Sequence, residues 1–220
     1  MRVAVIGAGN VGGTLGRRWA ELGHQVAFGV RRPAEGAEAV KGGGELPAGA
    51  RVATSIQAVR GADVVLLATP WGAVPDALRE AGAESGALDG VVLIDATNPL
   101  AAGLRLDTGP KGESGGERVQ ALAPRARVVK AFNTIGFNNM ARPAYDGAAT
   151  MMCYAGDDAG AKATARELIA ALGFDPVDAG PLSRSRELEH LAVLWIALAT
   201  GPGAGAPALG REFAFRLVRR

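Results

Sequence analysis

Short apolar runs alternate with segments of helical periodicity along most of the chain. Near-continuous runs of valine, isoleucine and leucine, at 63–69 and 90–96, are typical of parallel strands that are covered on both faces. Residues 11–22 place Leu15 and Trp19 on one helical face. The alternation predicts an α/β fold with a Rossmann-type, doubly wound, mainly parallel sheet. The expected strands are 2–7, 25–30, 51–54, 63–69, 90–96, 127–132, 149–156 and 174–180, and the expected helices are 11–22, 33–41, 55–60, 73–83, 114–122, 157–173 and 183–199.

The last third of the chain is expected to extend the same sheet within a single domain. We expect a dinucleotide-binding core at 1–145 and an extension at 146–220, which carries the acceptor side and a dimer contact. Within the extension, a linker rich in glycine, proline and alanine at 200–210 precedes "EFAFRLV" (212–218). The alternation of this last segment predicts a closing strand.

A long Gly-rich loop is expected at 100–116. It ends at Ser114, whose spacing to Glu117 is that of a capping box at the start of a helix. A contact between Ser114 and a bound substrate is the less favoured alternative.

Composition narrows the classes of partner. With 48% hydrophobic and 21% charged residues, the 220-residue chain resembles an ordinary globular protein. A net charge of +2 without a continuous basic face, and 5% aromatic residues, argue against a nucleic-acid partner. A single cysteine, Cys153, fits a reducing compartment, so we expect a cytoplasmic protein. The start of the chain has no secretory signature, and the longest apolar run, 191–199, is far shorter than the roughly 20 residues that span a bilayer.

The strongest motif is "VIGAGNVGG", which follows the first strand and opens a helix. Gly7 allows the tight turn, Gly9 lets the backbone approach a pyrophosphate, and Gly12 allows close packing of helix and strand. The helix N-terminus supplies backbone N–H groups and a positive dipole for the phosphates. A merely Gly-rich turn is the competing explanation, and the strand–turn–helix context favours a dinucleotide site.

The region after the second strand indicates which dinucleotide. NAD-binding proteins usually carry an acidic residue there, about 20 residues beyond the glycines, for the ribose hydroxyls. Here Arg31 and Arg32 occupy the place, and no carboxylate follows until Glu35. Guanidinium groups bind a 2′-phosphate through paired, charge-assisted hydrogen bonds. The sequence therefore predicts NADP(H) over NAD(H); a solvated basic pair is the alternative.

Polar, uncharged side chains follow three of the expected strands. In an open α/β sheet, ligands bind beyond the carboxyl ends of the strands, where the strand order reverses. We therefore expect these side chains to converge on the nicotinamide and to form a wall beside it. Hydride transfer between two stacked planar rings depends mainly on proximity, so such a site works without a side-chain base. Ordinary turn chemistry is the competing explanation. The expected wall residues are Thr69, Pro70, Thr97, Asn98, Asn133 and Thr134, and Ile135 next to them is expected to bind substrate.

Other side chains are weaker candidates. His190 lies in the apolar last helix, where contact with substrate is the less favoured interpretation. Lys130 ends a strand, but no pattern of carboxylates surrounds it in the sequence, and Asp95 is expected to be structural. Cys153 is expected to be buried and inert, and Trp71 either lines the pocket or caps a helix. No set of His, Cys or Asp residues has metal-ligand spacing.

Four segments resemble a known family. "RVAVIGAGNVGG", "LLATPW", "VVKAFNT" and "DPVDAGPLSRSRELE" are similar to the NADPH-dependent reductases of the deazaflavin coenzyme F420. The cytosolic NADPH-binding domain of the membrane ferric and cupric reductases shares the same fold unit. The resemblance implies that Arg31 and Arg32 take the 2′-phosphate and that Thr69, Pro70 and Asn133 border the nicotinamide. The residues that it assigns to the pyrophosphate are Gly7, Gly9, Asn10, Val11 and Gly12.

The resemblance also implies an acceptor side and a dimer. Pro181, Leu182 and Ser183 would approach the acceptor ring, next to Trp71, and the helix at 188–199 would lie in a homodimer interface.

The chain departs from that pattern in three ways. Val30 stands where the reductases often have serine, which would weaken the grip on the phosphate. The 101–116 loop offers only Arg105 and Lys111 to an acidic acceptor tail. The transmembrane haem region of the metalloreductases has no counterpart here, so no contact with a membrane is expected.

Three functions remain open from the sequence. The first is hydride transfer between NADP(H) and a deazaflavin (coenzyme F420) or flavin acceptor. The second is reduction of a small imine or carbonyl, which would need a proton donor such as Tyr145, Tyr154, Lys130 or His190. The third is a non-enzymatic NADP(H)-binding sensor.

Overall fold

One eight-stranded sheet forms the centre of the computed structural model, which describes residues 1–201 and 208–220. Neighbouring strands are parallel except β8 and β11, which pair antiparallel. The predicted Rossmann-type sheet is therefore confirmed, and β11 and β12 continue it, whereas the division at 145/146 stays a prediction. In spatial order the strands are β12 (Asp175–Gly180), β11 (Met151–Gly156), β8 (Arg127–Lys130), β5 (Val92–Asp95), β4 (Val64–Leu67), β1 (Arg2–Ile6), β2 (Gln25–Gly29) and β3 (Ala50–Ala53).

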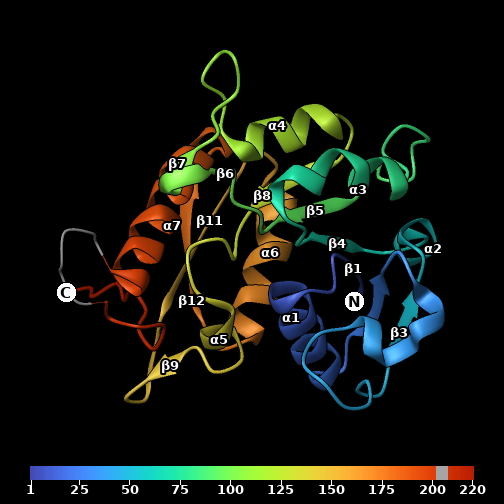
Figure 1. Ribbon diagram of the computed structural model, residues 1–220, viewed down its shortest axis with the longest axis horizontal. Coiled ribbons are helices and arrows are strands. Elements are labelled where there is room, and N and C mark those ends of the chain that lie inside the picture. Colours follow the sequence, from blue (N-terminus) through green and yellow to red (C-terminus); the bar gives the residue numbers. More distant parts are fainter. Residues whose placement is uncertain (202–207) are drawn as a thin grey trace.

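Helices cover the sheet on both sides (Figure 1). The helices α3 and α4 lie on one side of the sheet, and α1 and α6 lie on the other. The helices are α1 (Asn10–Glu21), α2 (Ser55–Val59), α3 (Val74–Glu80), α4 (Gly115–Leu122), α5 (Phe137–Met140), α6 (Ala159–Ala171) and α7 (Ser185–Thr200). Among the described residues, no helix has both the length and the apolar character to cross a bilayer.

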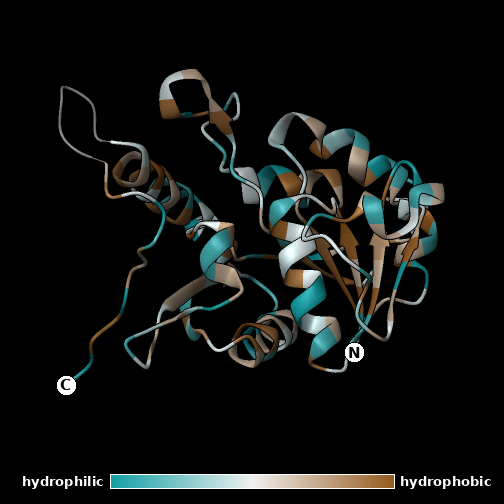
Figure 2. Cartoon of the chain, turned by 60° about the horizontal axis from the view of Figure 1, so that its bottom comes forward, coloured by the Kyte–Doolittle hydropathy of each residue, from teal (hydrophilic) through white to brown (hydrophobic). Residues whose placement is uncertain are grey.

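The two cores follow from the period of two along each strand. In β1, Val3 and Val5 pack with Trp19 in one core, while Ala4 and Ile6 face the opposite core. β4 and β5 are buried on both faces, so their residues are mainly apolar, and the central strands appear brown in Figure 2.

An aromatic chain joins the first and last thirds of the molecule. Trp19 packs edge-to-face on Phe132 at 5.7 Å, and Phe132 on Phe174 at 6.3 Å. The indole N–H of Trp19 also donates to the carbonyl of Leu168, so α1 and α6 are held together.

The predicted closing strand at 212–218 is wrong. This segment belongs to no sheet, and its backbone meets the sheet at one hydrogen bond, from Met151 N–H to the Phe215 carbonyl (3.0 Å). Its alternating aromatic residues pack on α7 instead: Phe213 stacks on Trp195 at 5.1 Å, and its carbonyl accepts from the Trp195 indole. Much of the predicted linker at 200–210 lies outside the described residues.

Several loops contain more structure than expected. The 100–116 loop holds a small hairpin, and α5 with a second hairpin follows β8. The weak helix expected at 33–41 is a 3₁₀ segment with a kink at Gly36, where φ is +58°. The short elements are η1 (Pro33–Ala39), η2 (Trp71–Ala73), β6 (Leu100–Ala101), η3 (Ala102–Leu104), β7 (Arg105–Leu106), β9 (Ala144–Tyr145), β10 (Ala148–Ala149) and η4 (Leu182–Arg184).

Candidate active site

The Gly-rich turn lies between β1 and β4, where the strand order reverses. Gly7 has φ +97°, and a Cβ there would lie 2.7 Å from the Ala68 carbonyl oxygen. A Cβ at Gly12 would lie 2.0 Å from the Gly7 carbonyl oxygen, so α1 passes too close to the turn for any side chain. At Gly9 a Cβ would meet nothing within 4 Å. Gly7 and Gly12 are thus needed for packing, whereas Gly9 leaves open space above the turn.

The start of α1 opens into this space. Gly9 is the N-cap residue and provides no side-chain cap, and the first turn carries no acidic residue. The first N–H groups of a helix have no partner within the helix, so those of α1 are available to an anion. The predicted phosphate-binding residues Asn10 and Val11 occupy this first turn.

A cavity of about 820 Å³ extends from the turn along the ends of β1, β2 and β4. Thr69 Oγ1 is buried and has no hydrogen-bond partner, so this cavity wall contains an unsatisfied polar atom. A dinucleotide with hydroxyl and phosphate groups would fit both the volume and this atom. The lining residues are Ile6, Gly7, Ala8, Gly9, Gly29, Val30, Arg31, Arg32, Glu35, Glu38, Ala39, Lys41, Ser55, Ala68, Thr69, Pro70, Ala73, Asp76, Ala77 and Glu80.

The two arginines of this cavity differ in their pairing. Arg32 forms an ion pair with Glu35 at 2.8 Å, and 79% of its side chain is exposed. No ion pair involves Arg31 among the described residues. Arg31 therefore has the free guanidinium group for a 2′-phosphate, a distinction that the adjacent letters "RR" do not reveal.

The predicted acceptor wall is brought together at the ends of β5 and β8. Asn98 Nδ2 donates to the Asn133 carbonyl (2.9 Å), and Asn133 Nδ2 donates to Asn98 Oδ1 (3.1 Å). Thr97, Thr134 and Ile135 are buried beside them. Asn133 Oδ1 is buried without a partner. The two loops are thus locked to each other, although none of these residues lines the cofactor cavity.

The backbone of the wall is unusual at Phe132, whose φ is +63°. A bulky residue reaches this left-handed region only when its surroundings hold it there. Phe132 is buried between Trp19 and Phe174, and its N–H points at Met152 Sδ, 3.2 Å away. Aromatic packing therefore fixes the direction in which residues 133–136 leave β8.

A buried ion cluster lies under this wall. Lys130 is fully buried, and its Nζ lies 2.9 Å from Asp95 Oδ2, 3.0 Å from Glu189 Oε1 and 2.7 Å from the Thr97 carbonyl oxygen. Desolvation is the largest single influence on the pKa of Lys130 and lowers it, but the two carboxylates together overcome desolvation and raise the pKa. Lys130 is thus a fixed cation, and the expectation that it lacks carboxylate neighbours is wrong.

Glu189 of α7 connects this helix to β8 and α4. Besides Lys130, it accepts hydrogen bonds from the N–H groups of Gly115 (3.0 Å) and Gly116 (3.1 Å), at the start of α4. A Cβ on Gly115 would lie 2.8 Å from Glu189 Oε1, so Gly115 lets the carboxylate approach, whereas a Cβ on Gly116 would meet Ser185. Ser114 caps the same helix through Glu117, as predicted. Glu189 was not predicted from the sequence; Gly115 was its signal.

Trp71 connects η2 to the loop that precedes α4. Its indole N–H donates to Asp107 Oδ2 (2.9 Å), and the Arg118 guanidinium lies 4.7 Å from its ring centroid. The hydrogen bond from Trp71 is the main cause that lowers the pKa of Asp107. Trp71 therefore anchors the loop rather than capping a helix, and it lies beside Pro70 of the cavity wall.

The residues predicted for the acceptor side lie apart from the cofactor cavity, as do His190 and Cys153. Leu182 is buried in the α3–α4 core, whereas Pro181 and Ser183 are exposed. His190 is exposed on α7, and its Nδ1 lies 2.8 Å from the Arg186 carbonyl oxygen. Burial is the main cause that raises the pKa of Cys153, which is partly buried in β11. None of these five residues lines the cavity.

Comparison with known proteins gives the family. Residues 2–99 match the family model "NADP oxidoreductase coenzyme F420-dependent". A crystal structure from Arthrobacter sp. FB24, assigned as an F420-dependent NADP-reductase, is 31% identical and superposes with a TM-score of 0.84, covering 100% of both chains.

Two further proteins share parts of this likeness. Metalloreductase STEAP3 of Rattus norvegicus is 30% identical over 191 residues, which are 86% of this chain; the chain spans only 36% of that protein's length. An imine reductase of Streptomyces aurantiacus shares the fold at 21% identity, with a TM-score of 0.63 over 94% of this chain and 68% of that one. Because the Arthrobacter protein matches from end to end, this chain belongs to the family of F420-dependent NADP oxidoreductases.

Proposed function

We propose that this protein transfers hydride between NADP(H) and a deazaflavin of the F420 type. The observation that carries the proposal is the cavity over the Gly7–Gly12 turn, with Arg31 free at one end and the paired Asn98 and Asn133 loops beyond the other. The full-length similarity to a protein assigned as an F420-dependent NADP-reductase supports the deazaflavin as acceptor.

Different residues bind different parts of the cofactor. The first-turn N–H groups of α1 hold the pyrophosphate, and Arg31 binds the 2′-phosphate. Thr69 Oγ1, which lacks a partner in the protein, donates or accepts a hydrogen bond with the cofactor. The cofactor supplies the hydride, and the protein places its nicotinamide against the acceptor ring and excludes water.

A small imine or carbonyl is a weaker candidate for the acceptor. Hydride adds to the carbon of the C=N or C=O bond, so its reduction needs a proton donor near the nitrogen or oxygen. Lys130 is fully buried in its ion cluster, the Tyr145 hydroxyl donates to Asn139 Oδ1, and Tyr154 is buried. His190 is on the exposed face of α7. Since Lys130 and Tyr145 already have their polar groups engaged, Tyr154 is buried and His190 lies on an exposed helix face, a deazaflavin or flavin acceptor is favoured.

Steady-state turnover tests the acceptor. NADPH oxidation by the purified protein is measured with coenzyme F420, with FMN and with a cyclic imine, and NADH replaces NADPH as the control. The proposal predicts turnover with F420 and NADPH at a kcat/KM at least tenfold above every other pair. Turnover with the imine alone would favour the imine reductase alternative, and tight NADPH binding without any turnover would favour a sensor.

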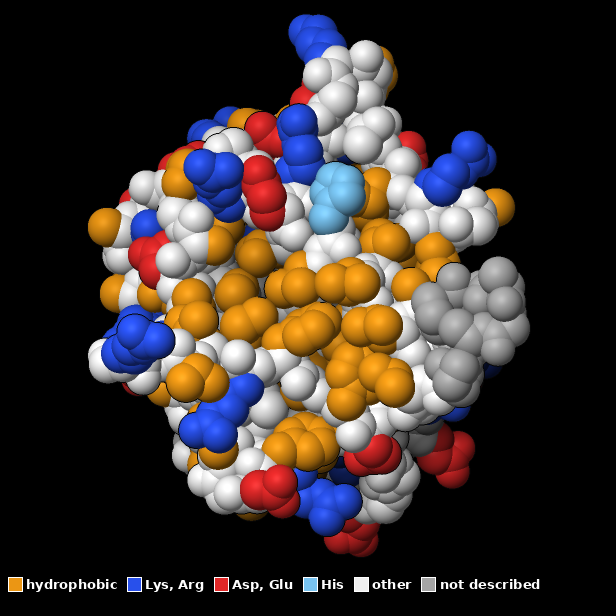
Figure 3. All heavy atoms as spheres, turned by 90° about the vertical axis from the view of Figure 1, so that its left-hand side faces the viewer, with side chains coloured by type: hydrophobic (Ala, Val, Ile, Leu, Met, Phe, Trp, Pro, Cys, Tyr) orange, Lys and Arg blue, Asp and Glu red, His pale blue; other side chains and the backbone are white. Residues whose placement is uncertain are grey.

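We further propose that two copies associate through α7. Figure 3 shows a broad apolar patch on this side, next to a pale blue histidine, with acidic and basic side chains around it. Leu194 is 49% exposed, and Leu191 and Ile196 are partly exposed. A patch that is apolar at its centre and carries both signs of charge at its rim suits a symmetric contact with a second copy of itself.

A further inference from the structure

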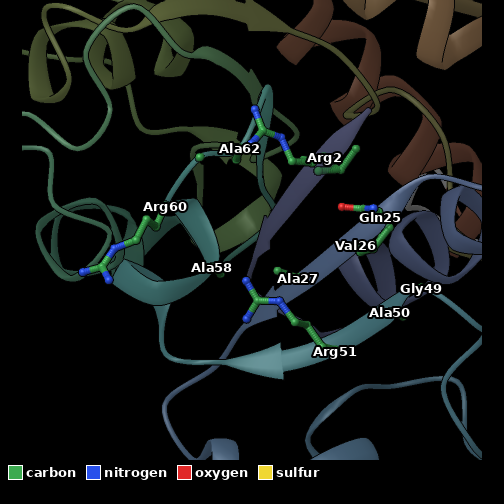
Figure 4. A pocket seen from close by; sticks show the side chains of 12 residues that line it. Arg2, Gln25, Val26, Ala27, Gly49, Ala50, Arg51, Ala58, Arg60 and Ala62 are labelled. Atoms are coloured by element: carbon green, nitrogen blue, oxygen red, sulfur yellow. The ribbon is translucent and has the colours of Figure 1, made fainter.

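A second cavity, of about 400 Å³, opens at the amino ends of β1, β2 and β3 (Figure 4). The cofactor cavity lies at the opposite, carboxyl ends of the strands. The existence of the second cavity follows from the length of α2. This helix has five residues and is about 7.5 Å long, whereas a five-residue strand such as β1 is roughly 16 Å long. The helix therefore covers only part of the strands beneath it.

Small residues leave the uncovered part hollow. Ala27 of β2 and Ala58 of α2 form the floor and are both buried, and Ala62 lies beside them. Larger apolar side chains at these positions would fill the space, as the buried Leu78 of α3 does between α3 and the sheet. The floor is thus an apolar surface that a ligand could cover.

The rim is basic. Arg2, Arg51 and Arg60 come from three separate segments; in Figure 4 the Arg51 side chain extends toward Ala27, whereas that of Arg60 extends away from both alanines. Arg2 is paired with Asp63 at 2.8 Å, so it contributes little free charge. Arg51 makes one long hydrogen bond, to the Gln57 carbonyl oxygen at 3.5 Å.

Two positive charges on this rim are thus unbalanced. Within the described parts of the chain, neither Arg51 nor Arg60 has an ion pair, and no carboxylate lines the cavity. The remaining polar side chain on the wall, Gln25, is uncharged. Two free guanidinium groups over an apolar floor provide paired donors for a phosphate and a surface for an organic group.

We propose that this amino-end cavity binds a small organic phosphate. The phosphate contacts the guanidinium group of Arg51 and that of Arg60, which turns toward the cavity when the ligand binds, and the apolar part of the ligand lies over Ala27 and Ala58. The site is separate from the cofactor cavity, with which it shares no lining residue. Its ligand therefore does not compete with NADP(H).

Titration with phenyl phosphate tests the proposal, with inorganic phosphate and phenol as the two part-ligands. Backbone amide signals in a ¹⁵N-labelled protein locate the binding, since those of Gln25, Arg51 and Gly61 report on the amino-end cavity. Those of Gly9 and Gly12 report on the cofactor turn. We expect shifts at the amino-end cavity with phenyl phosphate, a dissociation constant about tenfold lower than that of inorganic phosphate, and no displacement by NADP⁺.

Matched variants separate this site from general charge effects. Arg51→Gln and Arg60→Gln should each raise the dissociation constant for phenyl phosphate roughly tenfold, the loss of one charge-assisted contact. Arg166→Gln removes the same charge from an exposed position on α6 and should leave it unchanged. Thermal unfolding confirms that each variant folds. Shifts confined to Gly9 and Gly12, or equal affinities for the two rim variants and the wild type, would overturn the proposal.

Discussion

At the residue scale, the proposed preference for NADP(H) depends on one guanidinium group. Arg31 is free, whereas Arg32 is held by Glu35. Arg31→Ser should raise the KM for NADPH about tenfold to a hundredfold, because a charge-assisted hydrogen bond contributes about 1.5–3 kcal/mol. Arg32→Ser should have a smaller effect, and the KM for NADH should hardly change in either variant. Steady-state kinetics with both cofactors check this. Equal losses for NADPH and NADH would show that Arg31 does not read the 2′-phosphate.

His24 should make stability depend on pH. Its Nδ1 lies 3.2 Å from the N-terminal amine, and desolvation, followed by this positive charge, lowers its pKa below the usual value. The folded protein therefore favours the neutral imidazole, and stability falls as the pH drops through the unfolded-state pKa of about 6.5. In urea unfolding at pH 7.5 and pH 5.5, the wild type should lose more stability on acidification than His24→Asn. An equal loss in both proteins would contradict the assignment.

The sequence predicted the residues of the cofactor turn better than the buried residues behind the acceptor wall. Gly7, Gly9 and Gly12 have their roles in a local strand–turn–helix, which a motif specifies. The pairing of Lys130 with Glu189 joins segments far apart in the chain, and no local pattern could reveal it. Its only trace was Gly115, whose missing side chain admits the carboxylate.

At the scale of elements, the buried cluster holds β8, α4 and α7 in one arrangement. Lys130→Met would leave Asp95 and Glu189 as buried carboxylates without a cation, so we expect a loss of about 3–5 kcal/mol in the free energy of unfolding. As a matched control, Lys162→Met breaks a pair with Asp178 that is partly exposed, and about 0–1 kcal/mol is expected. Chemical denaturation measures both. Losses of similar size would mean that the cluster adds nothing beyond a surface pair.

The regular elements were the most predictable. Apolar runs predicted the central strands, since both faces of the sheet are buried there, whereas the edge strand β12 is no apolar run and is only partly buried. The pattern failed at 212–218, where alternating aromatics pack on Trp195 and Phe215 makes only one backbone bond to β11. It also missed the hairpins β6–β7 and β9–β10, whose strands are two residues long and carry no detectable period.

At the scale of the whole molecule, the apolar face of α7 should control association. Leu194→Glu places a charge at the centre of the patch, so a dimer should dissociate, and the mass in solution should fall to that of one 22.4 kDa chain. Leu122→Glu changes another exposed leucine, on α4, and should leave the mass unchanged. Light scattering after size-exclusion chromatography measures both. A wild-type protein that is already monomeric would contradict the proposed contact.

The two cavities lie at opposite ends of the strands of one sheet. The family membership concerns only the cofactor cavity at the carboxyl ends. For that cavity we propose that hydride passes directly from NADPH to a deazaflavin bound beside the Asn98–Asn133 wall. A single turnover of NADPH deuterated at C4 with coenzyme F420, followed by mass spectrometry of the reduced deazaflavin, tests this transfer. We expect the deuterium of one C4 face to appear in the deazaflavin. Retention of both C4 hydrogens in the cofactor, or reduced deazaflavin without deuterium from either face, would contradict it.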